Sequence, residues 1–429
     1  MHYEKKAISN ERTDRIIFIA IFILFSIITL WFFYKQAKHE GDLYPSDMEA
    51  YIRTMLGMQT RDDYPYPILF KTAALINKLS PSPQFAMAFT VNLFNCGGII
   101  LTKWLLDKQT RAKLLNTFST FGLFICSMIH GSVFQKLGIP YRYVSTGSPT
   151  PWHNHTYIAD RPFMLLAFVW TCYTLVSYEK DFSRNTRNEK GFLWKYFLFS
   201  AFLFLSTITK PSYTLPALFA AAIVMLFRLF RQRWTNFRQT FILALFYIPT
   251  LITLVVQYYV TFTGTNPEGL EKGIGVAFGL VWGYYASNIP LAILLGSAFP
   301  IVVLILNWNE IKTNTQYRFS WIIYLVSIIM ALVLYEGGSR TYDFNFLWGK
   351  NAGMFLTFYT SSIILINKTV NAQEEMRLSS KKCGLLYFQW GVFILHIIMG
   401  LWYFGLLCLG KRYDSVVFHQ ISELIIRMV

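Results

Sequence analysis

Carboxylates that could accept a proton stand in the run 41–51, which follows the first apolar stretch of the chain. Ser46 and Glu49 have the S-x-x-E spacing of a capping box, with Ser46 as the N-cap of a helix. Asp47 would then be the first helical residue, where the helix dipole favours a carboxylate. A carboxylate held there can also serve as a general base toward a hydroxyl group. Structural and catalytic roles therefore both stay open for Asp47 and for Glu49.

A second group of polar and aromatic side chains precedes an apolar run at 162. Trp152, His153 and His155 lie within four positions, and Asp160 and Arg161 follow them directly before Pro162. Residues two apart do not share a helix face, so the two histidines form no metal site unless the segment is extended and supplies further ligands. We expect one histidine to contact a substrate, or both to hydrogen-bond the loop. Asp160 and Arg161 are expected to be a charge pair at a helix start, with Pro162 as the first helical residue.

Cations that could meet a phosphate stand at two further sites. Lys210 lies in a short link between two apolar runs, and it either binds an anion or extends its ammonium to the membrane surface. Arg340 follows two glycines near a third such boundary, four positions after Glu336. The arginine either pairs with Glu336 or grips phosphate oxygens in a two-point contact. Asp62 and Asp63 lie in a proline-bounded turn that we interpret as solvated rather than metal-binding.

The elements that must position these groups are membrane helices. Of the 429 residues, 54% are hydrophobic and only 14% are charged. A soluble domain usually has about 25% charged residues, so a soluble fold, a secreted disulfide scaffold and a disordered chain are excluded. A membrane span needs about 20 mostly apolar residues. We predict an all-α polytopic bundle of about 11 spans, at 16–34, 85–105, 114–130, 162–178, 194–208, 213–229, 239–259, 287–306, 319–335, 353–367 and 385–409.

The distribution of Lys and Arg predicts the orientation of the bundle. With the N-terminus in the cytoplasm, the short inner segments hold 23 of the 39 basic residues and the longer outer segments hold 16. This bias is typical of cytoplasmic loops, and it accounts for the net charge of +16 without a nucleic-acid partner. The chain is then one transmembrane domain, 1–429, with outer loops at 35–84, 131–161, 260–286 and 336–352. Chemistry on the outer face excludes ATP- and nucleotide-dependent enzymes.

Together these features resemble the GT-C superfamily of integral-membrane glycosyltransferases, in particular those associated with bacterial cell-surface polysaccharides. The resemblance is architectural over most of the chain. Its sharpest points are Asp47 in the first outer loop, the Lys210-Pro211-Ser212 turn, and the stretch from Glu336 to Trp348. Many members carry adjacent acids in the first loop, whereas here Met48 separates Asp47 from Glu49.

The resemblance implies an enzyme of the bacterial inner membrane that uses a polyprenyl-phosphate-linked sugar as donor and a glycan or lipid-linked acceptor. Asp47, with Glu49 as a second candidate, would be the catalytic base, and transfer would invert the anomeric carbon. The donor phosphate would contact Arg340, Lys210 and Arg161. Substrate contacts would come from His153, His155, Trp152, Glu336 and Tyr44. No cofactor or metal ligand set is predicted, although a divalent metal is possible in this family.

Other functions remain open. A polysaccharide repeat-unit polymerase shares the location and the substrates, but it relies on outer-loop arginines, which are few here. A lipid-linked saccharide transporter would need ionisable groups near mid-membrane, and the predicted spans contain almost none. A purely structural membrane protein is the remaining alternative.

Overall fold

A computed structural model describes residues 2–38, 43–58, 64–129, 143–183, 192–264, 271–374 and 380–410. These residues form α-helices and one small antiparallel sheet, so the all-α prediction is confirmed. The first half of the described chain contains α1 His2–Lys38, α2 Met48–Met55, α3 Pro67–Asn77, α4 Pro83–Gln109, α5 Lys113–Ile125, α7 Tyr143–Thr146, α8 His155–Asp181 and α9 Phe192–Thr209. The second half contains α10 Thr214–Arg231, α11 Phe237–Leu245, α12 Ile248–Phe262, α13 Leu280–Tyr285, α14 Ile289–Leu306, α15 Asn309–Thr313, α16 Thr315–Val333, α17 Leu347–Glu374 and α18 Ser380–Cys408.

The chain is a multi-pass integral membrane protein, and its number of apolar spans differs from the prediction. Six described helices are long and apolar enough to cross a bilayer, namely α1, α4, α10, α14, α16 and α18. The pair α11 and α12, bent by 53° at its break, makes a seventh if it counts as one span. These seven correspond to seven of the eleven predicted runs, and the prediction of 11 spans is wrong.

The other four predicted runs do not form helices that are both long and apolar enough to be counted as membrane spans, for two physical reasons. The run at 114–130 forms only the 13-residue α5, which ends at Ile125. The run at 194–208 lies in the apolar helix Leu193–Thr209, which is shorter than the 18 residues of α10 and α14, the shortest helices counted as spans. The runs at 162–178 and 353–367 lie in α8 and α17, which are long but carry hydroxyl groups among their apolar residues. Residues 351–366 of α17 are buried throughout. A helix enclosed by other helices does not need an apolar face toward lipid, so its polar groups find protein partners, as Thr360 does with Ser320 at 2.8 Å.

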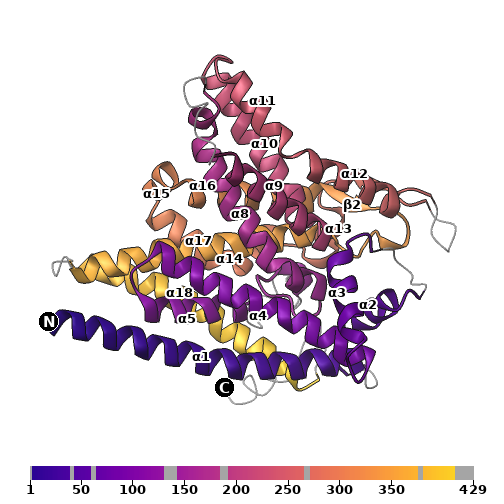
Figure 1. The fold of residues 1–429 in the computed structure, drawn as a ribbon, viewed down its shortest axis with the longest axis horizontal. Helices are drawn as coiled ribbons and strands as arrows, with labels where there is room; N and C mark the ends of the chain where they lie inside the picture. The colour runs from indigo at the N-terminus through magenta and orange to yellow at the C-terminus, as the bar shows by residue number, and fades with distance from the viewer. Residues whose placement is uncertain are drawn as a thin grey trace.

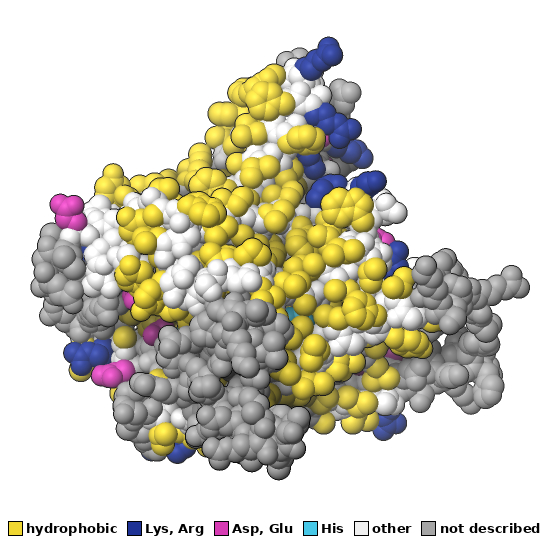
Figure 2. All heavy atoms as spheres, turned by 180° about the vertical axis from the view of Figure 1, so that it is seen from behind, with side chains coloured by type: hydrophobic (Ala, Val, Ile, Leu, Met, Phe, Trp, Pro, Cys, Tyr) yellow, Lys and Arg dark blue, Asp and Glu magenta, His cyan; other side chains and the backbone are white. Residues whose placement is uncertain are grey.

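Figure 1 shows α1 along one edge of the molecule and α10 and α11 projecting from the opposite edge. The helix α17 packs against α16, α14, α5 and α18, and α8 packs against α9 and α4. Figure 2 shows hydrophobic side chains over much of one face, with Lys and Arg gathered near the end where α10 meets α11. The sequence there holds Arg228, Arg231, Arg233 and Arg238. Exposed apolar residues such as Phe227 and Trp194 fit a lipid-facing surface.

The described parts of the four predicted outer loops contain regular structure. The segment 35–84 contains α2 and α3, the described part of 131–161 contains α7, and 260–286 contains β1 (Ile274–Val276) and α13. In the fourth segment, β2 (Leu334–Glu336) pairs with β1, placing Ile274 opposite Glu336, and a 3-10 helix covers Gly338–Arg340. This pairing joins two distant segments at one end of the bundle, where Figure 1 also shows α2, α3 and the end of α12. Their assembly at this end builds the candidate site.

Candidate functional site

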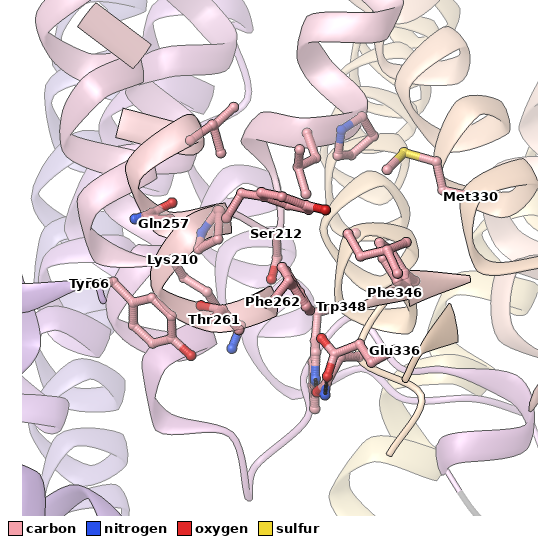
Figure 3. A pocket seen from close by; sticks show the side chains of 18 of the residues that line it. Tyr66, Lys210, Ser212, Gln257, Thr261, Phe262, Met330, Glu336, Phe346 and Trp348 are labelled. Atoms are coloured by element: carbon pink, nitrogen blue, oxygen red, sulfur yellow. Dashed lines mark hydrogen bonds between the residues drawn. The ribbon is translucent and has the colours of Figure 1, made fainter. Parts of the chain in front are cut away.

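A cavity of about 170 Å³ lies at this end of the bundle, between α10, α12, α16, the β1–β2 sheet and the start of α17. One water molecule needs a space of about 10–15 Å³, so the cavity has room for a ligand group. Figure 3 shows Tyr66, Lys210 and Glu336 around one part of it and Met330 on the opposite side. Its apolar walls include Leu215, Leu254, Met330 and Phe346. The cavity is therefore amphipathic, with charges at one end and hydrocarbon at the other.

Lys210 supplies one cation of the charged end. It follows the last residue of α9, and its side chain is buried. Its ammonium donates a hydrogen bond to the Thr156 hydroxyl at 2.8 Å and lies 5.3 Å from the Trp348 ring and 5.7 Å from the Tyr66 ring. Burial lowers the pKa of Lys210 to about 8, against the opposing effect of Asp47 and other carboxylates. Of the two sequence alternatives, the geometry disfavours extension to the membrane surface, because the ammonium is enclosed.

Arg340 and Glu336 lie across the same cavity and contact each other. The Arg340 Nε atom is 3.0 Å from Glu336 Oε2, so the predicted pairing is formed, and Arg340 also lies 3.6 Å from Asp343. Glu336 is buried, and its carboxylate accepts a hydrogen bond from the Asn345 side-chain amide at 2.8 Å. Both residues line the cavity, so pairing does not remove Arg340 from it. The pairing alternative is therefore formed, and contact with a phosphate stays a prediction.

Asp47 lies at the start of α2, near the charged end of the cavity. It accepts a hydrogen bond from the Tyr51 hydroxyl at 3.1 Å. The carboxylate is exposed, and it is close enough to Lys210 to oppose the fall in the pKa of that lysine. The predicted capping box is not formed, because Asp47 rather than Ser46 is the N-cap and makes no side-chain cap bond. The Ser46 hydroxyl instead accepts from the backbone N–H of Met48 at 3.3 Å.

Glu49 is exposed on α2, and with Asp47 at the N-cap the capping role that the sequence offered for it is absent. The predicted pair of acids at Asp62 and Asp63 lies outside the described residues.

The two histidines have different surroundings. The His153 ring packs 5.4 Å from the Trp348 ring, which itself lines the cavity. Burial and the nearby charges of His155 and Lys210 lower the pKa of His153 to about 3, so it is neutral at pH 7. His155 bonds Gln36 of α1 through Nε2 at 2.8 Å and packs its ring on Phe33. His153 therefore borders the site, whereas His155 ties α8 to α1.

Two other predicted contact residues lie away from the cavity lining. Trp152 is buried among Phe25, Phe32 and Phe404, with a centroid distance of 4.3 Å to Phe404. Tyr44 donates a hydrogen bond from its hydroxyl to the Cys408 carbonyl at 3.3 Å. These positions make both residues part of the packing between α1, α18 and the segment before α8.

Arg161 is fully buried, with Phe124, Tyr157 and Phe355 rings 5.0–5.5 Å from its guanidinium carbon. The helix starts at His155 and not at Pro162, which lies inside α8. The expected helix-start pair with Asp160 is therefore absent from the start of α8. The Pro149 carbonyl accepts one hydrogen bond from Arg161 at 3.4 Å.

Several cavity residues were not singled out from the sequence. Tyr66 and Trp348 enclose the Lys210 ammonium, and Gln257 donates hydrogen bonds to the carbonyls of Pro65 and Thr207. Gln257 was detectable as a strongly polar side chain within the apolar run 248–262. Lys350, a buried cation that does not line the cavity, lies 4.9 Å from the Trp282 ring and donates a hydrogen bond to the Thr146 carbonyl.

Among the residues that the structure describes, no three His, Cys, Asp or Glu side chains form a group that could hold a metal ion. Comparison of the chain with known proteins finds no matching family model, no matching curated protein and no matching solved structure.

Proposed function

We propose that this protein is a glycosyltransferase of the bacterial inner membrane that transfers a sugar from a polyprenyl-phosphate donor to an acceptor on the outer face. The observation that carries the proposal is the amphipathic cavity, with Lys210 and Arg340 at its charged end and hydrocarbon walls behind them. A lipid-linked sugar phosphate has the same division between an anionic head and an apolar chain. The GT-C resemblance belongs to this proposal, as does the outward orientation inferred from the charge distribution.

The two cations have complementary roles in the proposed reaction. The Arg340 guanidinium is suited to two-point contact with phosphate oxygens, and the Lys210 ammonium is suited to a single charge contact. Both positive charges stabilise the phosphate as it leaves and gains negative charge. This electrostatic stabilisation is stronger for Lys210, because its ammonium is enclosed and away from bulk water. Trp348 and His153 offer ring faces beside this phosphate position.

Asp47 is the proposed base. It removes the proton of the acceptor hydroxyl while that oxygen forms a bond to the anomeric carbon. The bond between this carbon and the phosphate oxygen breaks, and its electron pair leaves with the polyprenyl phosphate. Attack from the side opposite the leaving group inverts the anomeric centre. Glu336, buried and already bonded to Arg340, is assigned to positioning that arginine.

The base assignment is tested by substituting Asp47 with Asn, which is nearly isosteric but cannot take the proton. We expect transfer of a labelled sugar from a polyprenyl-phosphate donor, measured in membrane vesicles, to fall by at least about 100-fold. Because Asp47 makes no side-chain cap bond, α2 and the amount of folded protein should be unchanged. Glu49→Gln, on the same helix and exposed, is the matched control and should retain most of the activity. Full transfer by a well-folded Asp47→Asn protein would remove Asp47 from the mechanism.

A lipid-linked saccharide transporter is the second candidate. Buried ionisable groups on α8 and α17, namely Asp160, Arg161 and Lys350, favour it, because transporters place such groups along a substrate path. The two functions differ in product: a transporter moves the lipid-linked sugar between leaflets without forming a new glycosidic bond. The transfer assay with donor on one side only therefore separates them.

A further inference from the structure

A second apolar hollow lies away from the first, between α4, α8 and α16. Its volume of about 550 Å³ is more than three times that of the first cavity. It is lined by the last turns of α4, the middle of α8 and the first residues of α16, so it lies toward the ends of the helices remote from Lys210.

The walls of this hollow are hydrocarbon and aromatic rings, and three of them are more than half exposed. Trp104 and Tyr173, on α4 and α8, are 52% and 58% exposed, and Val176 is 63% exposed. Leu166, Val169 and Trp170 complete the apolar surface. In a multi-pass membrane protein such a surface faces lipid. Because it is concave, it can contact an acyl chain from more than one side, which a flat helix face cannot.

The polar groups of the hollow all lie at one end. They are Lys108, Gln109, Thr315 and Gln316, which belong to the last turn of α4 and the first turn of α16. The exposed Lys108 ammonium lies 6.0 Å from the Trp104 ring, and Gln109 donates to the Tyr359 hydroxyl at 2.7 Å, which fixes this end to α17. A cation beside tryptophan and tyrosine at a helix end is the arrangement found at the headgroup level of a bilayer. The lining contains no acidic side chain.

We propose that this hollow binds one anionic phospholipid of the surrounding membrane. Its acyl chain lies along Val169, Trp170 and Tyr173, and its phosphate contacts Lys108 and the amides of Gln109 and Gln316. The combination of a cation, uncharged hydrogen-bonding groups and no acid favours an anionic headgroup over a zwitterionic one. The site is independent of the proposed glycosyltransferase activity, because it shares no residue with the first cavity.

The test uses the full chain in nanodiscs containing equal amounts of phosphatidylglycerol and phosphatidylcholine. After release into detergent, native mass spectrometry counts the lipids that remain bound. We expect phosphatidylglycerol to be retained by the wild type, and Val169→Trp, which fills the hollow, to reduce this retention by at least about tenfold. Lys108→Gln should reduce the preference for phosphatidylglycerol over phosphatidylcholine. Leu226→Trp, on the exposed face of α10, and Lys312→Gln, on α15, are the matched controls and should behave as the wild type.

A second measurement covers the case in which Val169→Trp fails to fold. A photo-crosslinking amino acid replaces Tyr173, an exposed side chain whose exchange leaves the buried packing intact. Lipid adducts at this position should be enriched in phosphatidylglycerol relative to the nanodisc composition, whereas adducts at position 226 should reflect that composition. Adducts with the bulk composition at both positions, or equal retention by Val169→Trp and the wild type, would overturn the proposal.

Discussion

Lys210 illustrates how one side chain acquires its properties from its neighbours. Two aromatic rings and the hydroxyl of Thr156 surround its ammonium, and burial lowers its pKa to about 8. Its positive charge therefore titrates within the range in which membrane enzymes are assayed. The phosphodiester of a lipid-linked sugar keeps its charge in that range, so changes in donor affinity report on the lysine.

Donor affinity is consequently expected to depend on pH. Lys210 is protonated below pH 8 and loses its charge as the pH rises through 8, so an anionic donor binds best at low pH. If binding requires the charged form, the KM for the donor at pH 9 should be about tenfold higher than the value below pH 7.5. The Lys210→Arg variant stays charged and should show a flat profile. A wild-type KM that is constant from pH 7 to 9.5 would exclude Lys210 as a phosphate contact.

At the scale of elements, helix breaks are stabilised by side chains from other helices. α14 departs from helical geometry at Ser297, just before Pro300. The break leaves the Leu295 carbonyl to accept from Ile129 at 2.9 Å, and the backbone N–H of Phe299 to donate to His396 Nε2 at 3.2 Å. The other His396 nitrogen, Nδ1, lies 2.6 Å from the Ser127 carbonyl. His396 of α18 is thus a structural link between α14 and the residues that follow α5.

At the contact between α18 and α5, one position has no room for a side chain. A Cβ atom on Gly400 would lie 1.8 Å from the Ile125 carbonyl oxygen, at the end of α5. Gly400→Ala should force α18 away from α5 and lower the free energy of unfolding by about 1–3 kcal/mol, measured as a fall in Tm in detergent. Gly405→Ala, on the same helix with open space around it, is the control and should be neutral or slightly stabilising. Equal Tm values for the two variants would contradict this packing.

An ion network joins α1, α4 and α5 at the end of the bundle remote from the cavity. Lys103 contacts Asp14 at 3.0 Å and Asp107 at 2.7 Å, and Thr117 donates to Asp14 at 2.7 Å. Lys103 and Asp14 are both buried. The network fixes the first helix, which is otherwise largely exposed, to the body of the protein.

Removing the lysine should leave buried carboxylate charge without its partner. Lys103→Met is expected to lower the free energy of unfolding by about 3 kcal/mol. Lys368→Met breaks an ion pair with Glu310 in which the lysine is 47% exposed, and it should change stability by only about 0–1 kcal/mol. Thermal unfolding of both variants gives the comparison, and a Lys103→Met protein as stable as Lys368→Met would show that the network contributes little.

At the scale of the whole molecule, the sequence predicted the class of the protein better than its number of spans. A chain with few charges and long apolar runs needs a bilayer regardless of how its helices pack against one another. Composition was therefore enough to predict a multi-pass helical membrane protein. The run now seen in α17 was counted as a span because a run alone does not tell a lipid-facing helix from an enclosed one. That distinction depends on which helices pack around α17, and this is a tertiary property.

The sequence predicted some residues of the candidate site and missed others. Lys210 stood out in a short link between two apolar runs, and Glu336 and Arg340 stood out because they flank two glycines at another boundary, and the fold brings all three to one cavity. Trp152 and Tyr44 were assigned to substrate because aromatic residues were expected near a sugar, but the structure places them in the packing around α1. Tyr66 and Trp348 meet Lys210 from positions far apart in the sequence, and no local pattern marks such a contact.

The central claim is that Lys210 and Arg340 hold the anionic head of a lipid donor, and binding of that donor tests it most directly. The measurement is the Kd of a polyprenyl phosphate for the purified protein in nanodiscs, for the wild type, Arg340→Lys and Glu336→Gln. Lysine keeps the charge but loses the two-point contact, so Arg340→Lys should weaken binding by at least about tenfold. Glu336→Gln keeps a side-chain oxygen beside Arg340, where the pair now lies at 3.0 Å, and removes only the negative charge, so it should weaken binding less than Arg340→Lys does. Near-normal binding by Arg340→Lys, or a loss for Glu336→Gln as large as that for the arginine variant, would contradict the account.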